Sequence, residues 1–169
     1  MTRDFEQRLQ NEFEFMRNKN EQVRHYNFSG KRELMEAVGF DTEIKYSRYE
    51  IYGCECGDGW YETIRGLCLD ITAAYDEKGL EIDVVPVLIK EKFGEFRFYF
   101  DIGSSDMKNT VKELADKYRK LSKSVCAYCG GVGYVHKELY WVIPLCDGCY
   151  SKHIEGGPER LLRTKDMEK

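Results

Sequence analysis

The strongest constraint on this chain is a set of four cysteines arranged in two close pairs. Cys126 and Cys129 form the first pair, Cys146 and Cys149 form the second, and sixteen residues separate the pairs. Two C-x2-C pairs at this separation are typical of a structural zinc site. Zinc binds four thiolates in a tetrahedron, with Zn–S distances of about 2.3 Å. We therefore predict one Zn2+ held by these side chains; the alternative is four ordinary buried thiols.

The residues around the cysteines support this interpretation. Gly130 and Gly131 follow the first pair and Gly148 lies within the second, where the lack of a Cβ permits a tight turn. Between the pairs, residues 134–135 and 140–143 predict the two short strands of a hairpin, and hence a zinc ribbon. Four cysteine ligands leave no coordination position for water, so the predicted metal is structural and the function lies on a surface.

Composition and charge narrow the class of protein. The 169 residues are 42% hydrophobic and include nine Phe, twelve Tyr and two Trp, enough for a core. The net charge of −4 argues against broad phosphate binding, because proteins that bind in this way are usually basic. It favours a protein partner, including one with a basic surface. No membrane span or secretion signal is visible, so we expect a cytoplasmic protein with reduced thiols.

Helical spacing of apolar residues recurs in four segments, residues 3–19, 31–38, 60–78 and 107–122. The most regular stripe consists of Trp60, Ile64, Leu67, Cys68, Ile71 and Tyr75. We expect Asp58 to cap this helix, Gly79 to end it and Cys68 to be a core thiol. The stripe of the first segment, Phe5, Leu9, Phe13 and Met16, predicts a helix that packs on the body or is offered to a partner.

A hairpin is predicted between the two central helices. Residues 80–90 are rich in β-branched side chains, with Pro86 indicating an edge or a bulge. Phe96, Phe98 and Phe100 follow on one strand face, opposite Arg97, Tyr99 and Asp101, and should pack on the 60–78 helix. Residues 43–52 alternate loosely and predict a strand or an aromatic loop.

The predicted fold class is therefore α+β: a helix–β-hairpin–helix body with a C-terminal four-cysteine zinc ribbon and an N-terminal helical extension. We expect four parts along the chain: a helical extension at 1–42, the α+β body at 43–123, the zinc ribbon at 124–155 and a charged tail at 156–169.

Three motifs carry a resemblance. They are GDGWY at 57–61, KEKFGxxRFY at 90–99 and the two C-x2-C pairs. Together they resemble an uncharacterised family of small bacterial and phage or prophage zinc-ribbon proteins, over roughly residues 57–149. That family commonly has a second glycine and a leucine after Phe-Gly, where this chain has Glu95 and Phe96. The resemblance implies a helix–hairpin–helix body with a zinc ribbon and a mobile-element origin in a bacterial host cell. It implies no reaction.

The second motif also supplies the best candidate for a partner-binding surface, formed by Lys90, Lys92, Phe93, Arg97 and Tyr99. Three cations around one turn can bind phosphate or a carboxylate surface. The alternative is a solvated hairpin tip, on which lysines prevent edge-to-edge pairing of strands.

Catalysis is not predicted. The histidines, His25, His136 and His153, are far apart in the sequence, and no nucleophile elbow, phosphate loop or HExxH-type helix is present. Nothing selects a pair among the carboxylates Asp58, Glu62, Glu91 and Asp101. Cys54 and Cys56 could join a histidine in a second metal site, but their C-x-C spacing fits two small residues near a turn better.

We expect the chain to act by binding. The first hypothesis is a phage or prophage protein that binds a host or phage protein, such as a nuclease or nucleoprotein complex. Such a protein can inhibit a host nuclease or a defence system in the manner of an anti-CRISPR protein. The alternative is a nucleic-acid-binding zinc ribbon, in which Lys137 and the aromatic residues Tyr134, Tyr140 and Trp141 assist the hairpin cations.

Overall fold

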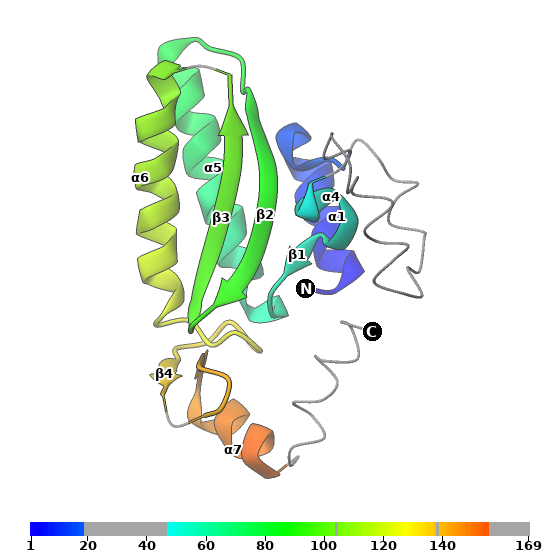
Figure 1. Cartoon of the computed structure of the whole chain (residues 1–169), viewed down its shortest axis with the longest axis vertical. Coiled ribbons are helices and arrows are strands. Elements are labelled where there is room, and N and C mark those ends of the chain that lie inside the picture. Colours follow the sequence, from blue (N-terminus) through cyan, green and yellow to red (C-terminus); the bar gives the residue numbers. More distant parts are fainter. Residues whose placement is uncertain (19–46, 104, 138, 156–169) are drawn as a thin grey trace, which may run out of the picture.

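A three-stranded sheet and two long helices organise the described part of the chain. The computed structural model describes residues 1–18, 47–103, 105–137 and 139–155. Within them the protein mixes helices with strands, and the four cysteines cluster near one end. This confirms the mixed helix-and-strand class (Figure 1). The predicted helix at 31–38 and the charged tail lie outside the described residues.

The sheet has the order β1-β2-β3, with β1 (Cys54–Glu55) parallel to β2 (Val84–Lys92) and β2 antiparallel to β3 (Glu95–Ile102). The register shifts between Pro86 and Leu88, so the predicted bulge at the proline is confirmed. The first strand of the hairpin begins at residue 84, four residues later than the sequence predicts. Leu80 and Glu81 instead continue the connection from the preceding helix.

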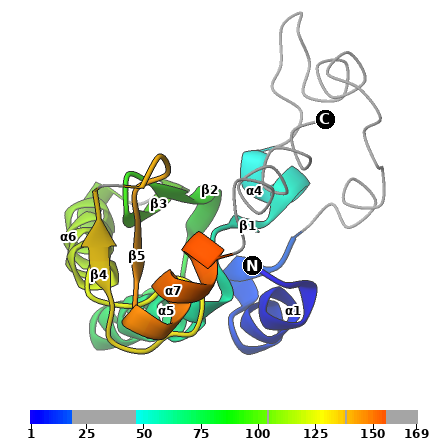
Figure 2. The ribbon, with the colours of Figure 1, turned by 90° about the horizontal axis from the view of Figure 1, so that it is seen from below.

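Two helices, α5 (Tyr61–Lys78) and α6 (Ser105–Ser122), pack together beside the hairpin. In the view from the end that carries the cysteines, α5 lies on one side of β2 and β3, and α6 lies next to β3 (Figure 2). Every member of the predicted α5 stripe, from Trp60 to Tyr75, is fully buried, and Phe96 and Phe98 are buried with it. Gly79 ends α5 in the left-handed conformation, with φ of 62°, as predicted.

The predicted cap of α5 is wrong. Asp58 lies in a short 3-10 turn, η2 (Asp58–Trp60), and the residue at the helix N-cap is Trp60, which makes no side-chain capping bond. The Asp58 carboxylate accepts a hydrogen bond from the backbone N–H of Thr2, at 2.5 Å. The side chain therefore joins the beginning of the chain to the turn before α5 instead of capping the helix.

The N-terminal helix belongs to the core. α1 (Arg3–Glu12) is followed by η1 (Glu14–Met16), and Leu9, Phe13 and Met16 are 1%, 5% and 0% exposed. The Tyr49 hydroxyl donates a hydrogen bond to the Met16 carbonyl oxygen, at 2.7 Å. Of the two interpretations of this stripe, packing on the body is confirmed, but the helix predicted for residues 3–19 ends at Glu12, because Phe13 is extended and residues 14–16 form a 3-10 turn.

Residues 48–52 form a helix, so the strand or loop predicted there is wrong. In α4 (Arg48–Tyr52), the Ser47 side chain accepts from the Glu50 N–H while the Glu50 carboxylate accepts from the Ser47 N–H. This capping box satisfies donors that a single helical turn leaves free. Residues 43–46 of the prediction lie outside the described residues.

The cysteine end of the molecule contains a small antiparallel pair, β4 (Tyr134–His136) and β5 (Ile143–Leu145), followed by α7 (Asp147–Glu155). The predicted second strand is displaced, because pairing begins only at Ile143 and Tyr140 is 87% exposed. One continuous core cluster includes Leu9 of α1, Trp60 beside α5 and Leu145 of β5. The four-part division of the chain stays a prediction.

Candidate metal centre and adjoining surface

The fold brings the four predicted cysteines to one point. Cys126 and Cys129 lie on the turn after α6, Cys146 follows β5, and Cys149 lies in the first turn of α7. Their sulfur atoms all lie within 4.8 Å of one another, and the Sγ atoms of Cys129 and Cys146 are 3.7 Å apart. Sulfur ligands of a tetrahedral zinc site lie about 3.8 Å apart, from Zn–S bonds of about 2.3 Å. The cluster could therefore bind a metal ion.

The backbone of the first pair is closed by hydrogen bonds. The Cys126 carbonyl accepts from the Gly130 N–H at 2.9 Å, and the Cys126 N–H donates to the Gly131 carbonyl at 2.7 Å. Gly130 has φ of 79°, a conformation that requires glycine in practice. Gly131 and Gly148 have no such role: a Cβ at Gly131 would make an ordinary 3.6 Å contact, and a Cβ at Gly148 would meet nothing within 4 Å.

The pKa values of two of the four thiols, Cys126 and Cys149, are shifted in opposite directions. Burial would by itself raise the pKa of Cys126, but backbone hydrogen bonds from Cys129, Cys146 and Tyr128 lower this pKa to about 7. Burial and the neighbouring thiols raise the pKa of Cys149 to about 12. Several thiolates this close repel one another, and a divalent cation stabilises all of them at once. The donor set thus suits a thiophilic cation.

The four-cysteine cluster contacts the rest of the molecule at the GDGWY motif, residues 57–61. The Gly59 N–H donates to the Ala127 carbonyl at 3.0 Å, and the Trp60 indole N–H donates to the Val125 carbonyl at 3.0 Å. A Cβ at Gly57 would lie 2.0 Å from the Ala127 carbonyl oxygen, and one at Gly59 would lie 2.1 Å from that of Cys126. The glycines of GDGWY therefore allow the cysteine turn to rest directly on the start of α5.

A second set of hydrogen bonds joins the β2–β3 hairpin to the segment between the two cysteine pairs. The Glu91 carboxylate accepts from the Gly94 N–H at 2.8 Å and from the Trp141 indole N–H at 2.5 Å. Burial raises the pKa of Glu91, although both of these hydrogen bonds act in the opposite direction. Glu91 therefore links the hairpin tip to the metal centre, a role that the sequence analysis missed.

Cys54 and Cys56 do not form a second metal site among the described residues. The only cluster of potential ligands found there is the four-cysteine group. Burial raises the pKa of Cys54 far above its usual range and that of Cys56 to about 12. Both side chains therefore remain protonated thiols. His25, a candidate partner for them, lies outside the described residues.

The other candidate catalytic groups occupy separate places. His136 stacks on Tyr150 with 4.1 Å between ring centroids, and His153 forms a 3.0 Å hydrogen bond with the Tyr128 hydroxyl. Of the predicted carboxylates, Glu62 pairs with Arg65, while Asp101 is exposed on β3. The structure gathers neither the two described histidines nor these carboxylates around a common point.

The predicted partner-binding residues lie together on the hairpin. Phe93 and Gly94 form its two-residue turn, with φ of 54° and 77°. Phe93 is 75% exposed, and the Lys92 ammonium lies 5.5 Å from its ring centroid. Lys90 is directly opposite Arg97 across the strand pair, and Tyr99 is 44% exposed on the same face. These positions put the cations and the two aromatic rings along one surface.

Three further residues complete this surface: Glu95, Arg119 and Lys123. They were not predicted from the sequence. The Glu95 side chain is only 6% exposed, and its carboxylate pairs with Arg97, with Arg119 at 2.9 Å and with Lys123 at 2.9 Å. Arg119 also pairs with Asp116, at 3.0 Å. Arg119 and Lys123 come from the C-terminal end of α6, far from the hairpin in the sequence. Only the packing of α6 beside β3 brings them together.

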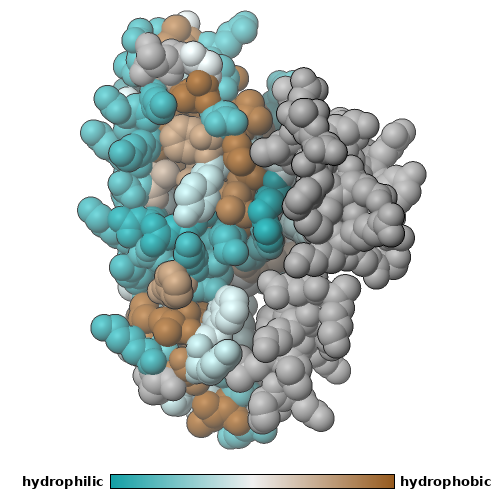
Figure 3. Space-filling view, viewed as in Figure 1, coloured by the Kyte–Doolittle hydropathy of each residue, from teal (hydrophilic) through white to brown (hydrophobic). Residues whose placement is uncertain are grey.

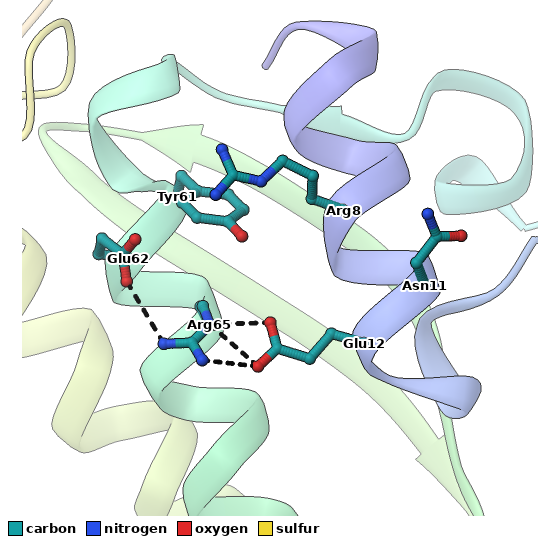
Figure 4. A pocket seen from close by; sticks show the side chains of 6 residues that line it. All are labelled: Arg8, Asn11, Glu12, Tyr61, Glu62 and Arg65. Carbon is teal, nitrogen blue, oxygen red and sulfur yellow. Dashed lines mark hydrogen bonds and ion pairs between the residues drawn. The ribbon is translucent and has the colours of Figure 1, made fainter.

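An open cavity of about 600 Å³ lies between α1 and α5. Figure 4 shows the Glu12 carboxylate reaching across it to the Arg65 guanidinium, with distances of 2.7 to 3.0 Å, and Arg8 lying over the ring of Tyr61. The Arg65 interactions lower the pKa of Glu12. The ion pair joins the N-terminal helix to α5, so the side chains have a structural role here.

The comparisons with family models, curated proteins and solved structures give no match. The family resemblance of the three motifs therefore stays a prediction. None of the described helices combines the length and the apolar composition needed to cross a membrane.

Proposed function

We propose that this chain is a zinc-stabilised binding protein without catalytic activity, which acts on a protein partner through its β2–β3 hairpin. The observation that carries the proposal is Phe93, a large apolar side chain that is 75% exposed at a tight turn. Aromatic and arginine side chains commonly provide most of the affinity at protein interfaces. Phe93, Tyr99 and Arg97 supply these chemical groups on one surface.

The metal of this proposal is Zn2+, bound by Cys126, Cys129, Cys146 and Cys149. When bound, it would cross-link the turn after α6 to the start of α7, and no ligand position would remain for a substrate. In this proposal the four-cysteine region is a zinc ribbon, and α5, the β2–β3 hairpin and α6 are a helix–hairpin–helix body. The N-terminal helices extend that body.

The biological setting of the proposal rests on the motif resemblance. A phage or prophage protein of the host cytoplasm would act on a host or phage protein, such as a nuclease, a nucleoprotein complex or another part of a defence system. An inhibitor that acts by binding needs no catalytic residues. This agrees with the separate positions of the described histidines and of the candidate carboxylates.

A second candidate function is nucleic-acid binding by the ribbon. It is favoured by the exposure of Tyr134, Tyr140 and Trp141, at 57%, 87% and 51%. Bases stack on exposed aromatic rings, and each stack contributes about 1–3 kcal/mol. The net charge of −4 opposes this candidate.

Affinity capture from a bacterial host lysate, with and without nuclease treatment, separates the two functions. We expect a protein that stays bound after nuclease treatment and is lost with the double variant Arg97→Glu and Tyr99→Ala. The matched control is Lys112→Glu with Leu69→Ala, which also reverses one charge and shortens one exposed side chain. Both variants should keep the zinc content of the parent and remain folded, although Arg97→Glu removes an ion pair of Glu95 and should lower the melting temperature.

Two results would overturn the proposal. Retention of the partner by the Arg97→Glu and Tyr99→Ala variant would place the interface elsewhere. Loss of all capture on nuclease treatment, together with salt-sensitive oligonucleotide binding, would establish the second function instead. Turnover of a nucleotide or nucleic-acid substrate that survives extensive purification would contradict the absence of catalysis.

A further inference from the structure

Five cations gather on the outer face of the hairpin and the adjoining end of α6. They are Lys90, Lys92, Arg97, Arg119 and Lys123, named here the cation cluster. In Figure 3, hydrophilic side chains cross the lower part of the β2–β3 face, with hydrophobic side chains above them and at the hairpin end below. The chain as a whole carries a charge of −4, so this cluster has a sign opposite to that of the molecule.

The centre of the cluster is a carboxylate. Glu95 Oε2 lies 2.9 Å from both the Arg119 guanidinium and the Lys123 ammonium, while Oε1 pairs with Arg97. Burial would raise the pKa of Glu95, but Lys123, Arg119 and Arg97 together lower it. Glu95 is therefore ionised, and one negative charge faces three positive ones. The geometry of the cluster already accommodates a carboxylate.

The cluster has positive charge that this arrangement does not neutralise. Lys90 and Arg97 are direct cross-strand neighbours, and like charges in such positions destabilise a sheet. Glu55 lies opposite Lys90 on β1, but its carboxylate is engaged by Arg48, at 2.8 Å. Neither Lys90 nor Lys92 makes an ion pair with any residue of the described part. An added anion would relieve this repulsion.

We propose that the cation cluster binds an acidic peptide segment of the protein partner, with its carboxylates next to Lys90, Lys92 and Arg97. This inference rests on the proposed function and specifies the partner's chemistry at the same surface. The aromatic rings of Phe93 and Tyr99 flank the cations and would pack on the apolar parts of the segment.

The extent of the cluster favours a short acidic segment over a nucleic acid strand. A strand needs a positive groove that follows its backbone over several nucleotides. Here Glu55 limits the positive surface on the β1 side, and Asp101 is exposed farther along β3. Asp116 also lies beside Arg119. Among the described residues, the cations thus form a compact patch and no continuous track.

The test uses the full chain and a fluorescent peptide that contains six consecutive glutamates. The comparisons are the same peptide with glutamine in place of each glutamate and a single-stranded oligonucleotide. Fluorescence anisotropy should show binding of the acidic peptide that weakens as salt rises, because exposed charges are screened. Lys90→Gln with Lys92→Gln should weaken it about tenfold, the loss expected for two exposed ion pairs. Lys108→Gln with Lys112→Gln, on α6 outside the cluster, should leave binding unchanged.

A second variant should raise the affinity for the acidic peptide instead of lowering it. Glu95→Gln removes the resident carboxylate and its ion pairs with Arg97, Arg119 and Lys123, so the acidic peptide should bind more tightly. A merely structural role of these residues would produce no gain. The thermal stability of each variant, measured in parallel, shows that the chain remains folded.

The outcomes separate this inference from the function on which it rests. Absence of acidic-peptide binding, or equal binding by the Lys90→Gln and Lys92→Gln variant, overturns the inference. Preferential binding of the oligonucleotide overturns it in favour of nucleic acid. If the captured partner is lost with Arg97→Glu and Tyr99→Ala but not with the lysine variant, the binding function stands and the acidic segment is wrong.

Discussion

At the scale of single residues, Gly59 explains how the four-cysteine cluster is attached to the body. A Cβ at Gly59 would lie 2.1 Å from the Cys126 carbonyl oxygen and 2.5 Å from the Gly130 nitrogen, both backbone atoms. Neither can move without opening the cysteine turn. The GDGWY motif is therefore a packing requirement of the metal centre, although it lies far from the cysteines in sequence.

Replacement of Gly59 by alanine tests this explanation. We expect a loss of about 1–3 kcal/mol or more in the free energy of unfolding, typical of an overpacked site. Gly148→Ala is the control, because nothing lies within 4 Å of its added Cβ and alanine favours the helix by up to about 1 kcal/mol. Urea denaturation measures both. A Gly59→Ala protein as stable as the parent would show that the turn does not rest on α5.

Glu91 gives a prediction on pH. Burial raises the pKa of its carboxyl in the folded chain above the unfolded value of about 4.3. Between these two values the folded state binds more protons than the unfolded state, so this residue's contribution to stability falls as pH rises through that window. Glu91→Gln cannot titrate. Its stability relative to the parent should rise between pH 4 and neutral pH, measured by urea denaturation; a constant difference would contradict the assignment.

The sequence predicted the four-cysteine cluster but only three of the five members of the cation cluster, Lys90, Lys92 and Arg97. The spacing of Cys126, Cys129, Cys146 and Cys149 is local information, because each pair forms within one turn. Arg119 and Lys123 join Glu95 only through the packing of α6 beside β3, and nothing in their local sequence distinguishes them from other helix-surface cations. Tertiary contacts of this kind cannot be inferred from spacing.

At the scale of elements, the hairpin has one face for the core and one for solvent. Phe96 is fully buried and contacts Trp60 edge-on, with 6.5 Å between ring centroids, whereas Tyr99 on the same strand is 44% exposed. Phe96→Ala should reduce the free energy of unfolding by about 3–5 kcal/mol. Tyr99→Ala should change it by no more than about 0.5 kcal/mol. Similar losses for both variants in a denaturant titration would mean that the two faces are misassigned.

Elements with a regular pattern could be predicted, and irregular ones could not. α5 has 18 residues and its apolar stripe repeats over several turns, so its helical period is unambiguous. α4 has five residues and is set by the Ser47 and Glu50 capping box, against alternation that favoured a strand. β5 contains Pro144 and pairs over three residues only, so the aromatic run before it was mistaken for the strand. Short elements depend on caps and neighbours more than on periodicity.

At the scale of the whole molecule, the metal centre and the body share one core. Trp60 donates to the Val125 carbonyl, one residue before Cys126, and Trp141 donates to Glu91 at the end of β2. Removal of the metal should therefore change the packing of α5 and the hairpin as well as the conformation of the cysteine turns. We expect chelation to change the fluorescence of buried Trp60, observed alone in a Trp141→Phe variant. An unchanged spectrum after complete metal removal would show that the two regions are independent.

The most direct test of the account is the metal content of the purified chain by native mass spectrometry and elemental analysis. The account predicts one zinc per chain, lost in Cys129→Ser and retained in Cys68→Ala, because Cys68 is a buried core thiol outside the cluster. Purified protein without zinc, or a Cys129→Ser variant that keeps a full equivalent, would contradict it.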